Sequence, residues 1–521
     1  MDGLEDVERL RRMKAAVLRN RRLRTESWIF AILAAEIIAL NFLWVPVNLD
    51  FAHFAFCDNG ANLSLQYLIS HGYRPTIDFA YPYGLLPILL GRIWFAIAGL
   101  SPIAFQILIL LCELGMGYAF ARIAAVLHLS GISIAIILIT LWFSIHPNYP
   151  SITHSSEALL LTLAMSEQAS RRRKRALIFS SAAVFAKPSM GYVYLAWMVM
   201  LWFGGTPRSE RRERFLSELF IPVAATGAVC GAVLSAIYGP RVLIRTLFPL
   251  EGLGVYKALN DGFFRGSGRL FWDPSHNSVL SYLFGPAGLW IFATIFLTCA
   301  AFGAARRIWF EPDSGNAPES MRDEIILTCF LLHAAFVCVF FGNQASWFYY
   351  SYFLVIGVAT AACLGTVGRR GGFVVCCLGA LSLFGATLAI LRDWKTQQPR
   401  AVTAWLWSPR AEAAEWSHVQ GITSGKHATI LDTKGAAELI FPQFQPPTSL
   451  YLDRGLMRQA EIDRKVQQLA DSDLVVVSLG PVTCGGIPRA PEIQGAMRNF
   501  DPIFRGQFFI VYQSTARGGS R

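Results

Sequence analysis

Charged residues are scarce in this chain. Asp, Glu, Lys and Arg together make up 16% of the sequence, whereas soluble domains carry about 25%. No internal repeat or low-complexity tract is visible, and the ten cysteines follow no metal-binding spacing. Only Cys57 and Cys484 lie outside apolar runs, and their spacing does not establish a disulfide. The low charge excludes an ordinary soluble protein, and the lack of a repeat disfavours a transporter built from inverted halves.

Hydrophobic residues are abundant instead. They make up 54% of the chain, and they collect in runs that approach the ~20 residues a membrane-spanning helix needs. The pattern predicts an all-α polytopic membrane protein with about eleven transmembrane helices. The apolar runs cover residues 30–47, 85–100, 103–127, 132–145, 152–165, 176–203, 220–238, 279–304, 325–341, 347–367 and 373–391.

The net charge of +11 lies mostly in short basic clusters between the apolar runs. Such clusters are typical of topology signals and not of nucleic-acid binding, because Lys and Arg resist translocation. They predict cytoplasmic positions for the N-terminus and for residues 171–175, 208–214 and 306–307. The basic leader has no small-residue cleavage pattern, so the first run is expected to be a retained anchor.

The number of membrane crossings between these cytoplasmic clusters leads to two further predictions. One run between residues 48 and 171 must not span, and the short run 85–100 is predicted to lie along the outer surface. The run 176–203 has basic clusters at both ends, which predicts a hairpin that turns at Lys187-Pro188 near the outer side.

Three regions follow from this topology. Residues 1–27 form a basic cytoplasmic N-terminus, and residues 28–391 form a transmembrane domain whose first external loop covers 48–84. Residues 392–521 are richer in charge and predict a small α/β domain on the outer face. Its expected strands cover 428–431, 474–478 and 508–512, with a polar helix at 458–469.

Polar groups at the outer face define a candidate site. A carboxylate there can take a proton from an attacking hydroxyl, and cations can stabilise an anionic leaving group on a lipid. The first external loop supplies Asp58 and Asp78 as candidate catalytic residues. The candidate phosphate-binding cations are Lys187, Arg241, Arg245 and Arg269, and the remaining candidates are Asn59, Tyr81, Tyr83, His154 and Glu157.

The order of these motifs resembles a known family. Asp58-Asn59-Gly60 follows the first helix, Asp78-Phe79 precedes Tyr-Pro-Tyr-Gly, and a later helix ends in Phe-Ala-Lys-Pro-Ser-Met-Gly at 185–191. Over residues 28–391 the chain is similar to the GT-C membrane glycosyltransferases. Within them it resembles the bacterial relatives of protein O-mannosyltransferases and lipid A aminoarabinose transferases.

The resemblance implies an inverting sugar transfer from a polyprenyl-phosphate donor to a glycan, lipid or protein acceptor at the periplasmic face of the bacterial inner membrane. Asp58 would act as the base, and Lys187 with an arginine of the 239–278 loop would hold the donor phosphate. Membrane lipids are the other expected partners. Many relatives carry Asp-Glu where this chain has Asp58-Asn59, so a divalent metal is left open and no other cofactor is implied.

Each candidate also has a simpler interpretation. Asp58 could be the N-cap of a helix that starts near Gly60, and Lys187 could reach the lipid interface as an anchor. His154 and Glu157 could merely begin a helix, and the arginines of the 239–278 loop could bind lipid headgroups. The alternative function is a transporter or flippase for a lipid-linked or anionic solute, in which the same cations would line a path.

Overall fold

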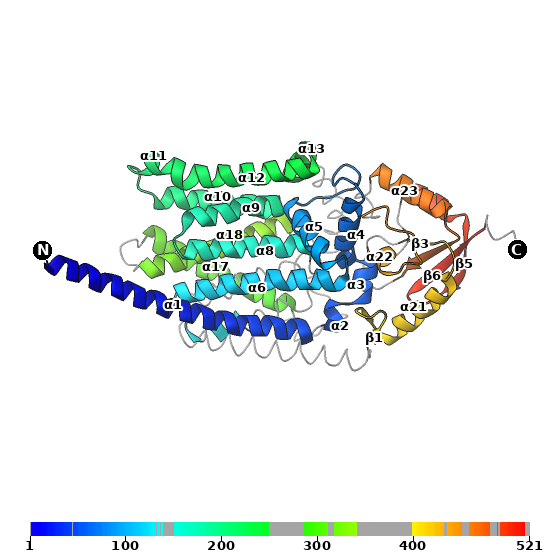
Figure 1. Ribbon diagram of the computed structural model, residues 1–521, viewed down its shortest axis with the longest axis horizontal. Coiled ribbons are helices and arrows are strands. Elements are labelled where there is room, and N and C mark those ends of the chain that lie inside the picture. Colours follow the sequence, from blue (N-terminus) through cyan, green and yellow to red (C-terminus); the bar gives the residue numbers. More distant parts are fainter. Residues whose placement is uncertain are drawn as a thin grey trace.

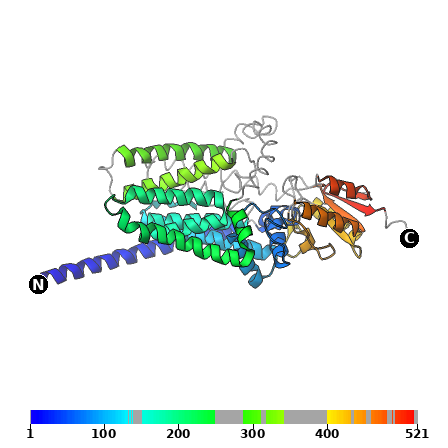
Figure 2. The same cartoon turned by 90° about the horizontal axis from the view of Figure 1, so that it is seen from above.

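A computed structural model describes residues 2–43, 45–131, 133–135, 137–138, 151–248, 286–310, 317–340, 399–431, 435–450, 458–479, 487 and 490–515. Asp58 is described by its backbone alone. A mostly helical part holds the N-terminus at one end, and a small domain with a β-sheet lies beyond the other end (Figures 1 and 2). The predicted runs 347–367 and 373–391, and most of 132–145, lie outside the described residues.

The helical part contains long apolar helices that pack side by side (Figure 1). In the described chain, three helical stretches are long and apolar enough to cross a membrane: Leu23–Leu43, Pro102–Val126 and Arg211–Tyr238. The predicted number of about eleven spans is therefore untested. The helices are α1 (Asp2–Leu43), α2 (Val45–Asn48), α3 (Phe51–Phe56), α4 (Asp58–Ser70), α5 (Leu86–Ala98), α6 (Pro102–Val126), α8 (Ile152–Ala169), α9 (Arg173–Ala186), α10 (Pro188–Gly205), α11 (Arg211–Arg214), the π-helix η1 (Phe215–Phe220), α12 (Ile221–Tyr238), α13 (Pro240–Leu247), α17 (Pro286–Phe310) and α18 (Ala317–Phe340).

The run 176–203 forms the expected hairpin. α9 ends at Ala186 and α10 begins at Pro188, so Lys187 is the single residue between them. Proline disfavours helical backbone in the residue before it, and Lys187 is accordingly extended, with φ −148° and ψ 103°. Gly191 allows the two helices to touch, because a Cβ there would overlap the backbone of Val184.

The basic clusters gather at the opposite end of the helices. Arg171 Nη1 lies 3.3 Å from Glu324 Oε1, and Arg307 Nη2 lies 2.6 Å from Asp323 Oδ1. The clusters at 171–175 and 306–307 therefore share one end of the molecule, as the topology argument requires. α5 has 13 residues, or about 20 Å of helix, which is short for a hydrocarbon core of about 30 Å; its surface position stays a prediction.

The C-terminal domain is built on a four-stranded sheet with strand order β3-β4-β6-β5. β3 and β4 are parallel, and the other neighbours are antiparallel. The bounds are β1 (Arg400–Ala401), β2 (Trp407–Ser408), α21 (Arg410–Thr423), β3 (Ala428–Leu431), α22 (Ala437–Ile440), α23 (Gln459–Ala470), β4 (Leu474–Ser478), α24 (Pro491–Met497), β5 (Phe500–Arg505) and β6 (Phe509–Ser514). β3 and β4 begin and end where the sequence predicts, while α21, α24 and β5 were not anticipated.

The two faces of the sheet are covered differently. Alternate side chains of β4 point to opposite faces, so Val475 and Val477 pack with Ile493 of α24 and Leu469 of α23. Leu474 and Val476 belong to another core cluster, which contains Trp416 of α21 and the phenylalanines of α3.

α3 belongs to residues 48–84, the predicted first external loop, yet its aromatic rings complete the core of the C-terminal domain. Phe51 and Phe56 lie 5.1 Å and 5.7 Å from Trp416, measured between ring centroids. The backbone joins the two regions as well, since Trp407 N donates to Leu49 O at 3.0 Å. The C-terminal domain and the first loop are therefore one packed unit, although more than 300 residues separate them in sequence.

Candidate functional site

The centre of the candidate site is a buried ionisable cluster at the tip of the α9–α10 hairpin. Lys187 Nζ lies 3.6 Å from Glu157 Oε2, and His154 Nδ1 lies 3.8 Å from the same oxygen. His154 and Glu157 are three residues apart on α8, so they share one face of that helix. The side chains of Lys187 and Glu157 are 5% and 4% exposed. A buried charge is costly unless it is paired, and Lys187 and Glu157 supply each other's countercharge.

Glu157 retains capacity for a ligand. Its Oε1 atom is buried and accepts no hydrogen bond from the part of the chain that the structure describes. A buried acceptor without a partner costs about 1–3 kcal/mol. An oxygen in that position is suited to a donor from a bound molecule.

A turn from the predicted first external loop covers this cluster. The ring of Tyr83 lies edge-on to His154, with 5.7 Å between centroids. Tyr81 Oη donates to Gly84 O at 3.2 Å and lies 3.4 Å from Thr153 Oγ1. The turn is fixed to the hairpin, because Gly84 N donates to Ala186 O at 3.1 Å.

Gly84 explains the glycine of the Tyr-Pro-Tyr-Gly motif. A Cβ at this position would overlap the carbonyl of Phe185. Only glycine allows the turn to approach the end of α9 this closely. The two motifs that the sequence places about a hundred residues apart are therefore in direct backbone contact.

Asp58 begins α4, and the N-cap of that helix is Cys57. The interpretation of Asp58 as an N-cap is therefore wrong: the extended backbone of Cys57, with φ −141° and ψ −165°, precedes the first helical residue, and that residue is Asp58. Cys57 is disulfide-bonded, whereas Cys112, Cys230, Cys299 and Cys329 are free. The sequence could not establish this bond. The disulfide restrains the backbone one residue before Asp58.

α4 also contacts the start of α8. Asn62 Oδ1 accepts a hydrogen bond from Ile152 N at 3.4 Å. Asn59, one turn earlier on α4, is buried, and its Oδ1 has no hydrogen-bond partner among the described residues. The helix that begins at Asp58 thus lies against the helix that carries His154 and Glu157.

Asp78 lies in a different environment. Its Oδ2 accepts hydrogen bonds from Arg74 N at 2.7 Å and Arg74 Nε at 3.2 Å. Partial burial raises the pKa of Asp78, but the hydrogen bonds and charge of Arg74 outweigh it, so the net pKa is lowered. The Asp78 carbonyl faces the C-terminal domain, because it accepts from Arg464 Nη2 at 2.8 Å. The structure therefore ties Asp78 to Arg74 and to α23.

Two of the arginine candidates, Arg241 and Arg245, lie on α13. Arg241 is exposed on α13, and Arg245 donates to the carbonyl of Thr76 at 3.1 Å. Arg269 lies outside the described residues. One side chain at the site was missed by the sequence analysis: Thr153, which contacts Tyr81. Its place next to His154 was the available signal.

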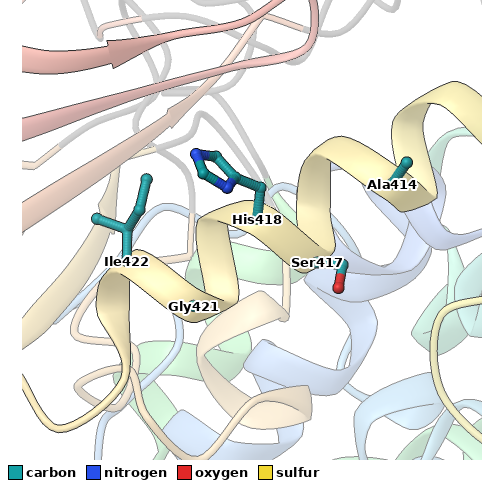
Figure 3. Close-up of a pocket in the computed structure, with 5 residues that line it drawn as sticks. All are labelled: Ala414, Ser417, His418, Gly421 and Ile422. Atoms are coloured by element: carbon teal, nitrogen blue, oxygen red, sulfur yellow. The ribbon is translucent and has the colours of Figure 1, made fainter.

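A metal-binding cluster and a second pocket would be the alternatives to this site among the described residues. No group of three or more His, Cys, Asp or Glu side chains in them is arranged to hold a metal ion. An open hollow of about 520 Å³ lies along α21 and is lined by Ala414, Ser417, His418, Gly421 and Ile422 (Figure 3). Among the described residues that line it, His418 is the only titratable one, and the described candidate residues are not among them.

Comparison with known proteins adds one solved structure. No family model matches the chain, and no curated protein matches it. The chain is similar to the crystal structure of ArnT from Cupriavidus metallidurans bound to undecaprenyl phosphate, with 12% sequence identity and a TM-score of 0.33. The similarity covers 91% of this chain and 97% of that one. At this identity and TM-score it assigns neither a family nor an activity.

Proposed function

We propose that the protein is a membrane glycosyltransferase. It transfers a sugar from a polyprenyl-phosphate donor to an acceptor hydroxyl at the periplasmic face of a bacterial inner membrane. The observation that carries this proposal is the buried cluster of Lys187, Glu157 and His154 under the Tyr81–Gly84 turn, beside the helix that begins at Asp58. Residues 28–391 are the transmembrane catalytic domain in this proposal, and residues 392–521 are the periplasmic domain.

Lys187 has the chemistry that a phosphate leaving group requires. Its ammonium group is buried, and its ion pair with Glu157 is long, at 3.6 Å. A phosphate oxygen that enters the cluster can share the ammonium charge. Oε1 of Glu157, which has no hydrogen-bond partner among the described residues, can accept a hydrogen bond from a hydroxyl of the sugar. A preorganised donor to a developing anion contributes about 2.7–4 kcal/mol. Arg245 and Arg269 are the proposed additional phosphate contacts.

Asp58 is the proposed base. The acceptor oxygen attacks the anomeric carbon, a new carbon–oxygen bond forms, and the bond to the donor phosphate breaks with its electrons on the phosphate. The acceptor proton moves to the Asp58 carboxylate, and direct displacement inverts the anomeric centre. Asp78 and Glu157 are each paired with a cation. Either would have to leave its ion pair before it could accept a proton.

Membrane lipids and a divalent metal remain partners to test. The exposed Arg241 on the amphipathic helix α13 is suited to lipid headgroups. A metal would have to use groups beyond the described side chains, since those form no cluster of three. Retained activity in a chelator would argue against a metal.

The test is incubation of the purified protein with a panel of polyprenyl-phosphate sugars, followed by measurement of released polyprenyl phosphate. Asp58→Asn should lower transfer by about 10²–10⁴-fold, the usual range for loss of a general base. Donor binding should survive. The helix should lose only about 0.3–1 kcal/mol, because a negative charge in the first turn is favourable. The matched control is Asp463→Asn, which changes an exposed acid on α23.

Two results would count against the proposal. Absence of release from every donor by the wild-type protein would remove the transferase function. Wild-type transfer by Asp58→Asn would instead move the base to Asp78 or Glu157, which the same substitution can test.

A transporter for a lipid-linked or anionic solute is the second candidate. Glu113 of α6 is buried among apolar helices and accepts a hydrogen bond from Asn41 of α1 at 2.7 Å. Ionisable groups inside spanning helices often mark transport paths. Transport would move the intact donor across a vesicle membrane without releasing polyprenyl phosphate, whereas the transferase releases it.

A further inference from the structure

The loop Tyr73–Ala80 connects α4 to the turn that covers the site, and its backbone is strained. Thr76 has φ +62°, a conformation that is a genuine outlier for a β-branched residue. The loop folds back on itself, since Asp78 N donates to Arg74 O at 2.9 Å. Strained backbone of this kind persists only where surrounding contacts hold it in place.

Contacts hold the loop from two directions. From the helical part, Arg245 of α13 donates to the Thr76 carbonyl at 3.1 Å. From the C-terminal domain, Arg464 of α23 donates to the Asp78 carbonyl at 2.8 Å and covers the ring of Tyr73 at 4.9 Å. The same guanidinium donates to Thr448 O at 2.9 Å, so it links the loop to its own domain.

Glu461, one turn before Arg464, supplies the last contact. Its side chain is fully buried, and its Oε2 accepts a hydrogen bond from Ala80 N at 3.3 Å. The carboxylate also accepts from Leu450 N and Arg458 N, both at 3.1 Å. It therefore joins the end of the loop to two backbone positions of the C-terminal domain.

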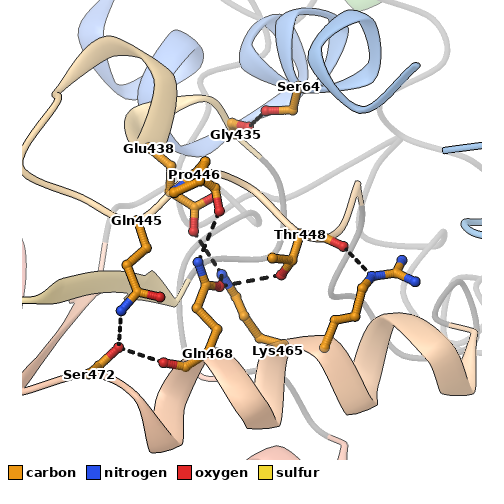
Figure 4. Close-up of polar contacts among 10 residues, drawn as sticks. Ser64, Gly435, Glu438, Gln445, Pro446, Thr448, Lys465, Gln468 and Ser472 are labelled. Carbon is orange, nitrogen blue, oxygen red and sulfur yellow. Dashed lines mark hydrogen bonds and ion pairs between the residues drawn. The ribbon is translucent and has the colours of Figure 1, made fainter. Parts of the chain in front are cut away.

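α23 is a firm support because neighbouring residues on the same face, Lys465 and Gln468, are anchored as well (Figure 4). Lys465 Nζ lies 2.8 Å from both Glu438 Oε1 and Gln468 Oε1. Gln468 Nε2 donates to Pro446 O at 3.0 Å. These contacts tie α23 to α22 and to the segment before Thr448. They restrain α23, so that Glu461 and Arg464 are held in place relative to the rest of the domain.

We propose that Glu461 and Arg464 are positioning residues for the site. Ala80 immediately precedes Tyr81, whose hydroxyl reaches Thr153 and Gly84. By fixing Ala80 and Asp78, α23 sets the place of the Tyr81–Gly84 turn over His154 and Lys187. The C-terminal domain thereby controls the geometry in which the acceptor meets the donor. This role in transfer rests on the proposed glycosyltransferase function, whereas the effect on the loop does not.

The experiment uses Arg464→Ala and Glu461→Gln in the full-length protein. Hydrogen–deuterium exchange should rise in peptides that cover residues 73–84 and stay unchanged in α9 and α10. The turnover number for sugar transfer should fall by about ten- to a hundredfold, since a shift of about 1 Å can cost a factor of 10². The donor KM should stay close to wild type, because Lys187 and Glu157 are untouched.

Matched variants separate positioning from folding. Gln467→Ala and Asp463→Asn change exposed residues of the same helix and should leave exchange and turnover unchanged. Arg464→Lys keeps the positive charge but replaces the planar guanidinium, with its several N–H donors, by a single ammonium group. It should restore part of the protection and part of the turnover, even if Arg464→Ala lowers the melting temperature.

The outcomes distinguish the two proposals. Unchanged exchange at 73–84 in both variants would overturn the positioning role. Raised exchange with wild-type turnover would reduce the contact to a structural one and also overturn it. A wild-type protein that releases no polyprenyl phosphate overturns the transferase function instead, and raised exchange in the variants would still establish control of the loop by α23.

Discussion

Two ion pairs, one buried and one partly exposed, differ in what surrounds them. Lys187 and Glu157 are 3.6 Å apart with side chains 5% and 4% exposed. Arg74 and Asp78 are closer, at 3.2 Å, but their side chains are 61% and 26% exposed. In water the closer pair contributes little, because solvent screens it. In a buried pair, removal of one partner is strongly destabilising. Burial, and not distance, therefore marks the first pair as the one the fold must maintain.

The largest effect that this comparison predicts is on stability. Glu157→Ala should lower the free energy of unfolding by about 3–5 kcal/mol, because it removes one member of a buried ion pair. Thermal or denaturant unfolding in detergent measures it. The double variant Glu157→Gln with Lys187→Met should recover much of the loss, since it removes both charges. If Glu157→Ala is as stable as wild type, water screens the charges of the cluster more than their burial indicates.

The next effect concerns donor binding and turnover. Lys187→Ala should reduce sugar transfer by about 10²–10³-fold, the usual loss for one donor to a developing anion. Lys187→Arg should retain part of the activity, because the charge survives while the geometry changes. Arg410→Ala, which removes an exposed cation of the C-terminal domain, serves as the control. Wild-type donor affinity and turnover in Lys187→Ala would leave the lysine as a structural partner of Glu157.

A third effect is a pH dependence at the contact between the loop and α23. Burial raises the pKa of Glu461 to about 7, although hydrogen bonds from Arg458, Leu450 and Ala80 and the charge of Arg464 oppose the shift. A raised pKa in the folded protein favours the protonated form. The stabilisation that protonated Glu461 contributes is therefore complete below the ordinary pKa of 4.5 and is lost as pH rises through about 7.

Unfolding of the wild-type protein at pH 5 and pH 8 measures this dependence. It should amount to at most about 3 kcal/mol, since one pKa unit corresponds to about 1.36 kcal/mol. Glu461→Gln should flatten the profile over this range, whereas Asp463→Asn should leave it unchanged. An identical profile in wild type and Glu461→Gln would show that another group titrates.

Local signals explain what the sequence predicted well. β3 and β4 are buried apolar runs whose ends coincide with the predicted ends, and the hairpin break follows from the proline after Lys187. No local sequence pattern predicts the packing of Phe51 and Phe56 on Trp416, because these residues are far apart in sequence. The same is true of the contact between Arg464 and Asp78. Long-range contacts of this kind define the domain boundary and the positioning of the loop.

The smallest effect belongs to the exposed pair. Asp78→Ala should lower the free energy of unfolding by about 0–1 kcal/mol, the range for exposed ion pairs. The pKa of Asp78 is lowered mainly by Arg74 against the opposing effect of burial. Its contribution is therefore present above the ordinary pKa of about 3.9 and is lost as pH falls below that value. Wild type and Asp78→Ala should differ at pH 7 and converge near pH 2, in unfolding experiments at constant salt. A loss as large as that of Glu157→Ala would show that Asp78 belongs with the buried cluster, and the comparison between the two pairs would fail.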